Sequence, residues 1–195
     1  GDLGYGHGTH VAGLVALVAP GARIMPLRVL GPDGSGNTWA LAEALLYAVN
    51  PDGDPTTDDG AHVINLSLGS VAPTKILETV AKLVTCRKPE PGSDPGYASD
   101  KKRCEGLGGA VVIAAAGNSA TDHVPEFPAA ENAHGLLSVG ASDASGARAE
   151  FSNYGKWVEV AAPGDHITSS VPGGGFGTWS GTSMAAQLAA GTAAL

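Results

Sequence analysis

The sequence predicts an α/β fold, a doubly wound and mostly parallel sheet with helices on both faces. Segments with the apolar spacing of a helix alternate with short apolar runs along the first part of the chain. One of these runs, residues 110–116, is wholly apolar, as in strands that are buried on both faces of a sheet. This alternation is typical of parallel strands joined by helices.

The first elements follow from periodicity and from turn residues. Val11, Leu14, Val15 and Val18 recur at helical spacing after His7 and predict a helix, which the following Pro-Gly pair ends. An apolar stretch at 22–30 predicts a strand, and a turn-rich stretch separates it from a predicted helix at 38–49. After the acidic loop, a strand is predicted at 62–68, a helix at 76–84 and the buried strand at 110–116.

Shorter strands are expected in the last third of the chain, at 136–140, 157–161 and 167–171. The glycine-rich residues 173–177 lack the G-x-G-x-x-G spacing of a phosphate-binding loop, so they are interpreted as a hairpin tip. An Ala-rich segment from Ser183 to the end predicts a helix with this serine at its N-terminus.

Composition limits the partners that the chain can have. With 195 residues, 43% of them hydrophobic and 15% charged, the chain is long enough for one globular domain. The net charge of -8 argues against a nucleic-acid partner. No apolar run approaches the roughly 18 residues needed to span a membrane, and the N-terminus has no signal-peptide pattern, which leaves the compartment open.

The two cysteines, Cys86 and Cys104, flank a segment rich in Pro, Gly and charged residues. A disulfide between them would stabilise the fold by about 3 kcal/mol in the chain-entropy model. Such a bond would favour an oxidising, extracytoplasmic setting, and two free thiols are the alternative.

Three polar residues stand where reactive groups collect in α/β folds, at the carboxyl ends of strands and the amino ends of helices. His7 opens the first helix, Asn118 follows the buried strand, and Ser183 opens the last helix. The amide of Asn118 and the backbone N–H of Ser183 can together form an oxyanion hole.

The segments around these residues, 6–13, 115–119 and 181–185, resemble the subtilisin-like serine proteases, the subtilases. Segments 30–36, 63–69, 127–129, 138–141 and 162–164 are also similar to that family, so the resemblance covers most of the chain. It implies a serine endopeptidase in which Ser183 attacks the peptide carbonyl, His7 moves the proton and Asn118 stabilises the oxyanion.

The resemblance also implies where an extended polypeptide substrate binds. The substrate lies between two edge segments by β-augmentation, and the predicted binding residues are Gly34, Ser35, Gly36, Ser67, Leu68, Gly69, Ala116, Gly117 and Glu126. In the family, the residue before the aromatic-Pro segment lies near the base of the S1 pocket. The carboxylate of Glu126 therefore predicts a preference for Lys or Arg at P1.

The family order is acid, histidine, serine, and the acid normally precedes the histidine by tens of residues. Asp2 is only five residues before His7 and is not assigned to the triad. We therefore expect one peptidase domain, 1–195, that is incomplete at both termini, whose first strand and triad Asp lie outside the chain. The isolated chain would then be inactive or very weak, and a propeptide upstream is compatible with the resemblance.

Alternatives remain for the activity. A catalytically inactive homologue that binds extended peptides would have no chemical need for His7, Asn118 and Ser183 together. An α/β-hydrolase esterase would need a G-x-S-x-G elbow, which the chain lacks. Gln187, where the family usually has proline, is interpreted as a change in helix packing. An extracellular or otherwise extracytoplasmic location is expected.

Two groups of residues could hold a metal ion, although the chemistry itself requires no cofactor. His7 and His10 could share a metal, but no third ligand has suitable spacing, so His10 is interpreted as a packed neighbour. The loop at 51–60 brings together Asp52, Asp54, Asp58 and Asp59, which could hold a structural calcium ion. The loop lacks the twelfth-position glutamate of an EF-hand, and a solvated turn is the alternative.

Overall fold

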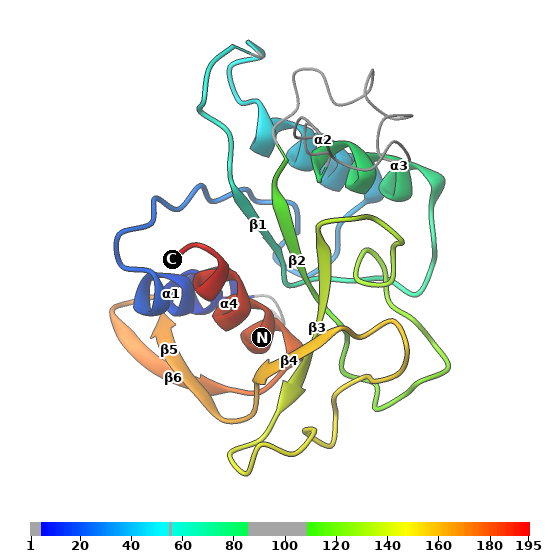
Figure 1. Ribbon diagram of the computed structural model, residues 1–195. Coiled ribbons are helices and arrows are strands. Elements are labelled where there is room, and N and C mark those ends of the chain that lie inside the picture. The colour runs from blue at the N-terminus through cyan, green and yellow to red at the C-terminus, as the bar shows by residue number, and fades with distance from the viewer. Residues whose placement is uncertain (1–4, 55, 86–108) are drawn as a thin grey trace.

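A computed structural model describes residues 5–54, 56–85 and 109–195 and shows a parallel four-stranded sheet (Figure 1). The strand order is β1-β2-β3-β4, with bounds Val63–Leu66, Val111–Ala115, Leu136–Ser142 and Val160–Pro163. A separate antiparallel pair is formed by β5 (Ile167–Val171) and β6 (Gly175–Trp179). The predicted α/β class, with a mostly parallel sheet, is confirmed.

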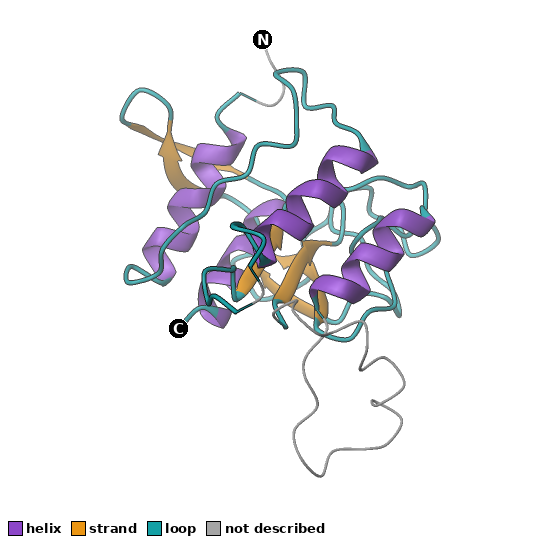
Figure 2. Cartoon of the chain, turned by 90° about the horizontal axis from the view of Figure 1, so that it is seen from above, coloured by secondary structure: helices purple, strands orange, loops and turns teal. Residues whose placement is uncertain are grey.

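Helices cover both faces of the parallel sheet. Helices α2 (Thr38–Val49) and α3 (Lys75–Val84) pack on one face, and α4 (Thr182–Ala193) packs on the other. Helix α1 (His7–Val18) lies against α4 and β5, as Figures 1 and 2 show. No helix in the described ranges is long and apolar enough to cross a membrane.

The central strand β2 divides the core into two layers because its side chains alternate between the faces. Val112 and Ala114 belong to the cluster beneath α2 and α3, whereas Ile113 and Ala115 belong to the cluster beneath α4. All four are at most 5% exposed. A strand that pairs on both sides and packs on both faces needs an uninterrupted apolar run, as the sequence predicted.

Local capping explains where α2 and α3 begin. The side chain of Asn37 accepts a hydrogen bond from the backbone N–H of Ala40 at 2.8 Å, and Thr74 accepts one from Leu77 at 3.3 Å. Each cap satisfies a donor that the first helical turn leaves without a partner, which contributes about 1 kcal/mol.

The prediction of a strand at 22–30 is wrong. Leu30 alone makes an isolated bridge, to Gly36, and the rest of the segment is irregular. A strand is stabilised by backbone hydrogen bonds to a neighbour, and within the described part of the chain no strand pairs with this segment. Val29 packs on the α2–α3 side of the core, whereas Ile24 is 44% exposed.

The bounds of β1 and β4 also differ from the prediction. Strand β1 ends at Leu66 and not at residue 68, so Ser67 lies beyond the ladder with β2. Strand β4 begins at Val160, because a turn closed by the hydrogen bond from Val158 N–H to Gly155 O precedes it. Cys86 and Cys104, with their predicted disulfide, lie outside the described residues.

Two leucines of α1 test the packing of this helix. Leu14 is 1% exposed and Leu17 is 72% exposed. Leu14→Ala leaves a cavity and is expected to lower the free energy of unfolding by about 2–5 kcal/mol. Leu17→Ala makes the same chemical change on the surface and should change it by at most about 0.5 kcal/mol. Urea denaturation of both variants measures the difference, and equal effects would contradict the placement of α1.

Candidate active site

His7, Asn118 and Ser183 line one pocket of about 550 Å³, although they are far apart in the sequence. His7 is the first residue of α1, Ser183 the second of α4, and Asn118 lies three residues beyond the end of β2. The other residues that line the pocket are Tyr5, Trp179, Ser180, Gly181 and Met184. The structure therefore brings the three predicted catalytic residues together.

The amide of Asn118 is oriented by Thr182. Its Oδ1 accepts hydrogen bonds from the backbone N–H of Thr182 at 2.8 Å and from the Thr182 hydroxyl at 3.0 Å. A backbone N–H can only donate, so these bonds assign the oxygen of the amide to Thr182 and turn Nδ2 to the other side. Asn118 can therefore offer Nδ2 as a donor in the pocket that it shares with Ser183.

Ser183 is tied to the carboxyl end of β1 by reciprocal contacts with Ser67. The hydroxyl of Ser67 donates to the carbonyl oxygen of Ser183 at 2.9 Å. The Oγ of Ser183 lies 3.5 Å from the carbonyl oxygen of Ser67, which is a long contact. Gln187 is 4% exposed and donates to the Ser67 hydroxyl at 3.3 Å. Gln187 thus supports this junction from the next turn of α4.

Trp179 holds the histidine end of α1. The His10 ring stacks on the indole of Trp179, with 4.6 Å between the ring centroids. The centroid of the His7 ring lies 6.4 Å from that of Trp179, and the two ring planes meet at an angle of 13°. His10 is fully buried, and its Nε2 hydrogen-bonds the carbonyl oxygen of Gly177 at 3.1 Å. These contacts confirm that His10 is a packed neighbour of His7.

Burial is the main reason that the pKa of His7 lies below its usual 6.5, and charge repulsion from His10 lowers it further. A histidine with a lowered pKa stays neutral at neutral pH. Neutral imidazole is the form that can accept a proton from a serine hydroxyl.

The predicted substrate-binding residues fall into two groups. Ser67, Leu68 and Gly69 follow β1, and Ala116 and Gly117 follow β2, so both segments lie at the same edge of the sheet as Asn118. Glu126 lies against Gly69 and Gly117. The loop with Gly34, Ser35 and Gly36 is closed on itself by Asp33, which accepts from the Ser35 N–H at 3.0 Å. No hydrogen bond in the described part of the chain joins this loop to Ser183.

Comparison with known proteins decides the family. The model of the subtilase family matches residues 2–195. The chain belongs to the subtilase family. It is 39% identical, across 97% of its length, to the thermophilic serine proteinase of Bacillus sp. (strain AK1). It is 37% identical, across 98% of its length, to subtilisin Savinase of Lederbergia lenta. The chain spans 42% of the first relative and 63% of the second.

Solved structures agree with this assignment. The crystal structure of a cold adapted subtilisin-like serine proteinase superposes on this subtilase chain with a TM-score of 0.73 at 32% identity. The match covers 97% of this chain and 60% of that protein.

Sequence reasoning missed three residues that organise this subtilase site. Thr182 anchors Asn118, Trp179 stacks on His10, and Asn153 donates to Glu126 at 3.2 Å. A hydroxyl residue between Gly181 and Ser183, at the start of the predicted helix, was a local signal for Thr182. Asn153 gave no such signal because its partners lie 27 or more positions away in the sequence.

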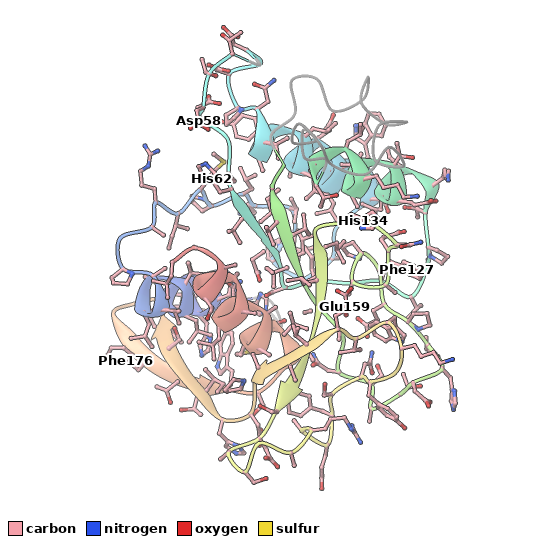
Figure 3. All side chains as sticks on the ribbon, in the orientation of Figure 1. Asp58, His62, Phe127, His134, Glu159 and Phe176 are labelled. Atoms are coloured by element: carbon pink, nitrogen blue, oxygen red, sulfur yellow. The ribbon has the colours of Figure 1, made fainter. Side chains whose placement is uncertain are left out.

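None of the described residues of the acidic loop lines the pocket of His7, Asn118 and Ser183. Asp52 and Asp54 accept hydrogen bonds from their own loop, and Asp58 lies 3.8 Å from His62. Figure 3 shows Asp58 and His62 well separated from Phe127, the neighbour of Glu126. Within the described ranges, no three His, Cys, Asp or Glu side chains are grouped so that they could hold a metal ion. Calcium binding by Asp52, Asp54, Asp58 and Asp59 stays a prediction.

The environment of His7 predicts its titration. Burial and the charge of His10 both disfavour the imidazolium, so His7 should lose its proton at a midpoint below 6.5. Ring-proton NMR across pH 4 to 9, approximate limits chosen around that reference value, measures the midpoint, and a His7→Gln spectrum assigns the signal. A midpoint at or above 6.5 would mean that the pocket does not desolvate this ring.

Proposed function

We propose that this subtilase is a serine endopeptidase that hydrolyses peptide bonds of extended polypeptides through an acyl-enzyme. The observation that carries the proposal is the shared pocket of His7, Asn118 and Ser183, with the Asn118 amide oriented by Thr182. The names of the relatives, which include serine proteinases and subtilisins, support the same class of reaction.

In the proposed mechanism, Ser183 Oγ attacks the scissile carbonyl carbon while His7 accepts the hydroxyl proton. The carbonyl oxygen becomes an oxyanion that accepts hydrogen bonds from Asn118 Nδ2 and from the backbone N–H of Ser183. His7 then donates its proton to the leaving amine, and the bond between carbonyl carbon and nitrogen breaks. His7 then accepts a proton from water as the water oxygen attacks the carbonyl carbon of the resulting ester. His7 returns this proton to Ser183 Oγ as the ester bond breaks, which releases the acid product and restores the serine hydroxyl. Every step uses protein groups and water.

We place the acid that orients His7 outside residues 1–195. No carboxylate in the described ranges hydrogen-bonds His7, and Asp2 lies outside those ranges. The acid of such a triad fixes the tautomer of the histidine and stabilises the imidazolium. For subtilisin itself, loss of the acid alone costs about 3 × 10⁴ in kcat. On this proposal the 195 residues alone hydrolyse peptides weakly or not at all.

The second candidate is an inactive subtilase that binds extended peptides at the segments after β1 and β2. Such a module needs the edge residues Ser67–Gly69 but has no use for an oriented amide beside a serine hydroxyl. The bonds from Thr182 to Asn118 therefore favour the enzyme. For either candidate, the partner is a polypeptide, the proposed location is extracytoplasmic, and a propeptide is proposed upstream.

A fluorophosphonate probe separates the two candidates. The probe forms a covalent bond only with an activated serine, so the protein, in the longest form that contains this chain, should be labelled at Ser183. Ser183→Ala should abolish labelling, and Ser180→Ala, which removes the neighbouring pocket hydroxyl, should retain it. Mass spectrometry of the labelled peptide gives the site. An unlabelled protein that still binds peptides would support the inactive candidate.

The oxyanion role of Asn118 predicts a loss in the chemical step. Asn118→Ala should lower kcat by about 10² to 10³ with little change in KM, a magnitude carried over from the oxyanion-hole asparagine of subtilisin itself. Thr182→Ser is the control, because it keeps the hydroxyl that donates to Asn118. Steady-state kinetics on one peptide substrate compare the variants. A rise in KM at constant kcat would assign Asn118 to ground-state binding instead.

A further inference from the structure

Gln187 is the one polar side chain in an apolar stretch of α4. The other residues from Met184 to Gly191 are Met, Ala, Leu and Gly. Gln187 is nevertheless only 4% exposed. A side-chain amide that is removed from water needs hydrogen-bond partners in the protein to replace its hydration. Its partners therefore indicate what this residue does in the fold.

The end of β1 supplies the partners of Gln187. Asn65 is the third residue of β1, and the backbone N–H groups of Leu66 and Ser67 each lie 3.2 Å from the oxygen of its amide. Because a backbone N–H can only donate, these two groups identify that atom as the oxygen. Nε2 of Gln187 donates to the same oxygen and, at 3.3 Å, to the hydroxyl oxygen of Ser67. One nitrogen of α4 thus uses both of its protons on the end of β1.

The hydroxyl of Ser67 has one proton and two acceptors within reach. The carbonyl oxygen of Ser183 lies 2.9 Å from the Ser67 hydroxyl, and the amide oxygen of Asn65 lies 3.0 Å from it. The Asn65 oxygen already accepts from two backbone N–H groups and from Gln187, which is more than its two lone pairs require. The proton of Ser67 is therefore left for the carbonyl oxygen of Ser183.

The bond to this carbonyl oxygen holds the residue that carries two of the proposed reacting groups. The hydroxyl of Ser183 is the proposed nucleophile, and its backbone N–H is a proposed oxyanion donor. Its Oγ also lies 3.5 Å from the carbonyl oxygen of Ser67. A displacement of about 1 Å at a reacting group can cost about 10²-fold in rate. A contact that fixes the backbone of Ser183 at the end of β1 therefore affects the chemical step.

We propose that Gln187 is a positioning residue for the nucleophile. By donating to Asn65, it directs the hydroxyl of Ser67 to the carbonyl oxygen of Ser183 and so holds Ser183 in place relative to Asn118. The inference rests on the proposed peptidase function. Gln187 touches neither the substrate nor the reacting atoms. The proline that is usual in the family at this position has no side-chain donor, so the family pattern does not supply this link.

Removal of the amide should slow the chemical step. Gln187→Met keeps an unbranched side chain of similar length and has no N–H donor. We expect it to lower kcat by about tenfold with little change in KM, the effect of about one hydrogen bond. Steady-state kinetics on one peptide substrate, with the longest form of the protein that contains this chain, measure both constants. Circular dichroism at the assay temperature verifies that the variant is folded. A higher KM at unchanged kcat would contradict the proposal.

A double-mutant cycle separates positioning from packing. Ser67→Ala removes the hydroxyl through which Gln187 acts. In the Ser67→Ala protein, Gln187→Met should therefore lower kcat no further, so the two effects on kcat are not additive. A residue that only packs α4 on the sheet would lower kcat by the same factor with or without the Ser67 hydroxyl. That result would refute a positioning role.

Thr192→Val is the matched control on the same helix. Thr192 is exposed, and its hydroxyl donates to the carbonyl oxygen of Leu188 at 2.8 Å. The substitution removes a side-chain hydrogen bond that lies within α4, and it should leave kcat and KM unchanged. If Thr192→Val lowered kcat as much as Gln187→Met, the effect would belong to α4 as a whole and the proposal would fail.

Unfolding measurements test the network even if no peptide is cleaved, a result that would refute the peptidase function by itself. Urea denaturation of the unmodified protein, the two single variants and the double variant gives the coupling between Gln187 and Ser67. We expect this coupling to change the unfolding equilibrium constant by about threefold or more, because the two side chains are in direct contact. Additive effects on stability would show that the network does not hold Ser67, and the positioning role would be lost with it.

Discussion

The active-site arrangement depends on the hydrogen bonds that join the start of α4 to the ends of β1 and β2. Thr182 accepts from the N–H of Gly117 and donates to Asn118, and Ser67 donates to the carbonyl oxygen of Ser183. These bonds connect residues at least 64 positions apart in the sequence. They place a serine hydroxyl and an amide donor in one pocket, because parallel strands end at a common edge.

Small side chains allow α4 to approach the sheet closely enough for these bonds to form. Ala185, Ala186 and Ala190 are at most 3% exposed and pack on Ala115 and Ala141 of the central strands. Larger residues at this interface would move the helix away from β2, because packed cores tolerate added volume poorly. The Ala-rich composition of the last helix therefore serves the geometry of the site as well as helix propensity.

Hydrogen bonds from neighbouring polar groups orient several polar side chains in and near the site. Asn118 is oriented by Thr182, Glu126 by Asn153, and His10 by the carbonyl oxygen of Gly177. Buried networks of this kind restrict each member to one rotamer. The His7 ring lies over the same indole as His10, so the stack on Trp179 extends this order to the proposed base.

The sequence by itself determined the helices, the central strand and the three catalytic candidates, because apolar periodicity, caps and short motifs are local signals. Only the tertiary structure decided which apolar segments become strands and which polar residues meet. Residues 22–30 have strand-like composition, yet no described strand pairs with them. Asn153 is unremarkable in the sequence and becomes a neighbour of Glu126 only through folding. Strand pairing and polar contacts depend on partners distant in the chain, which no local pattern specifies.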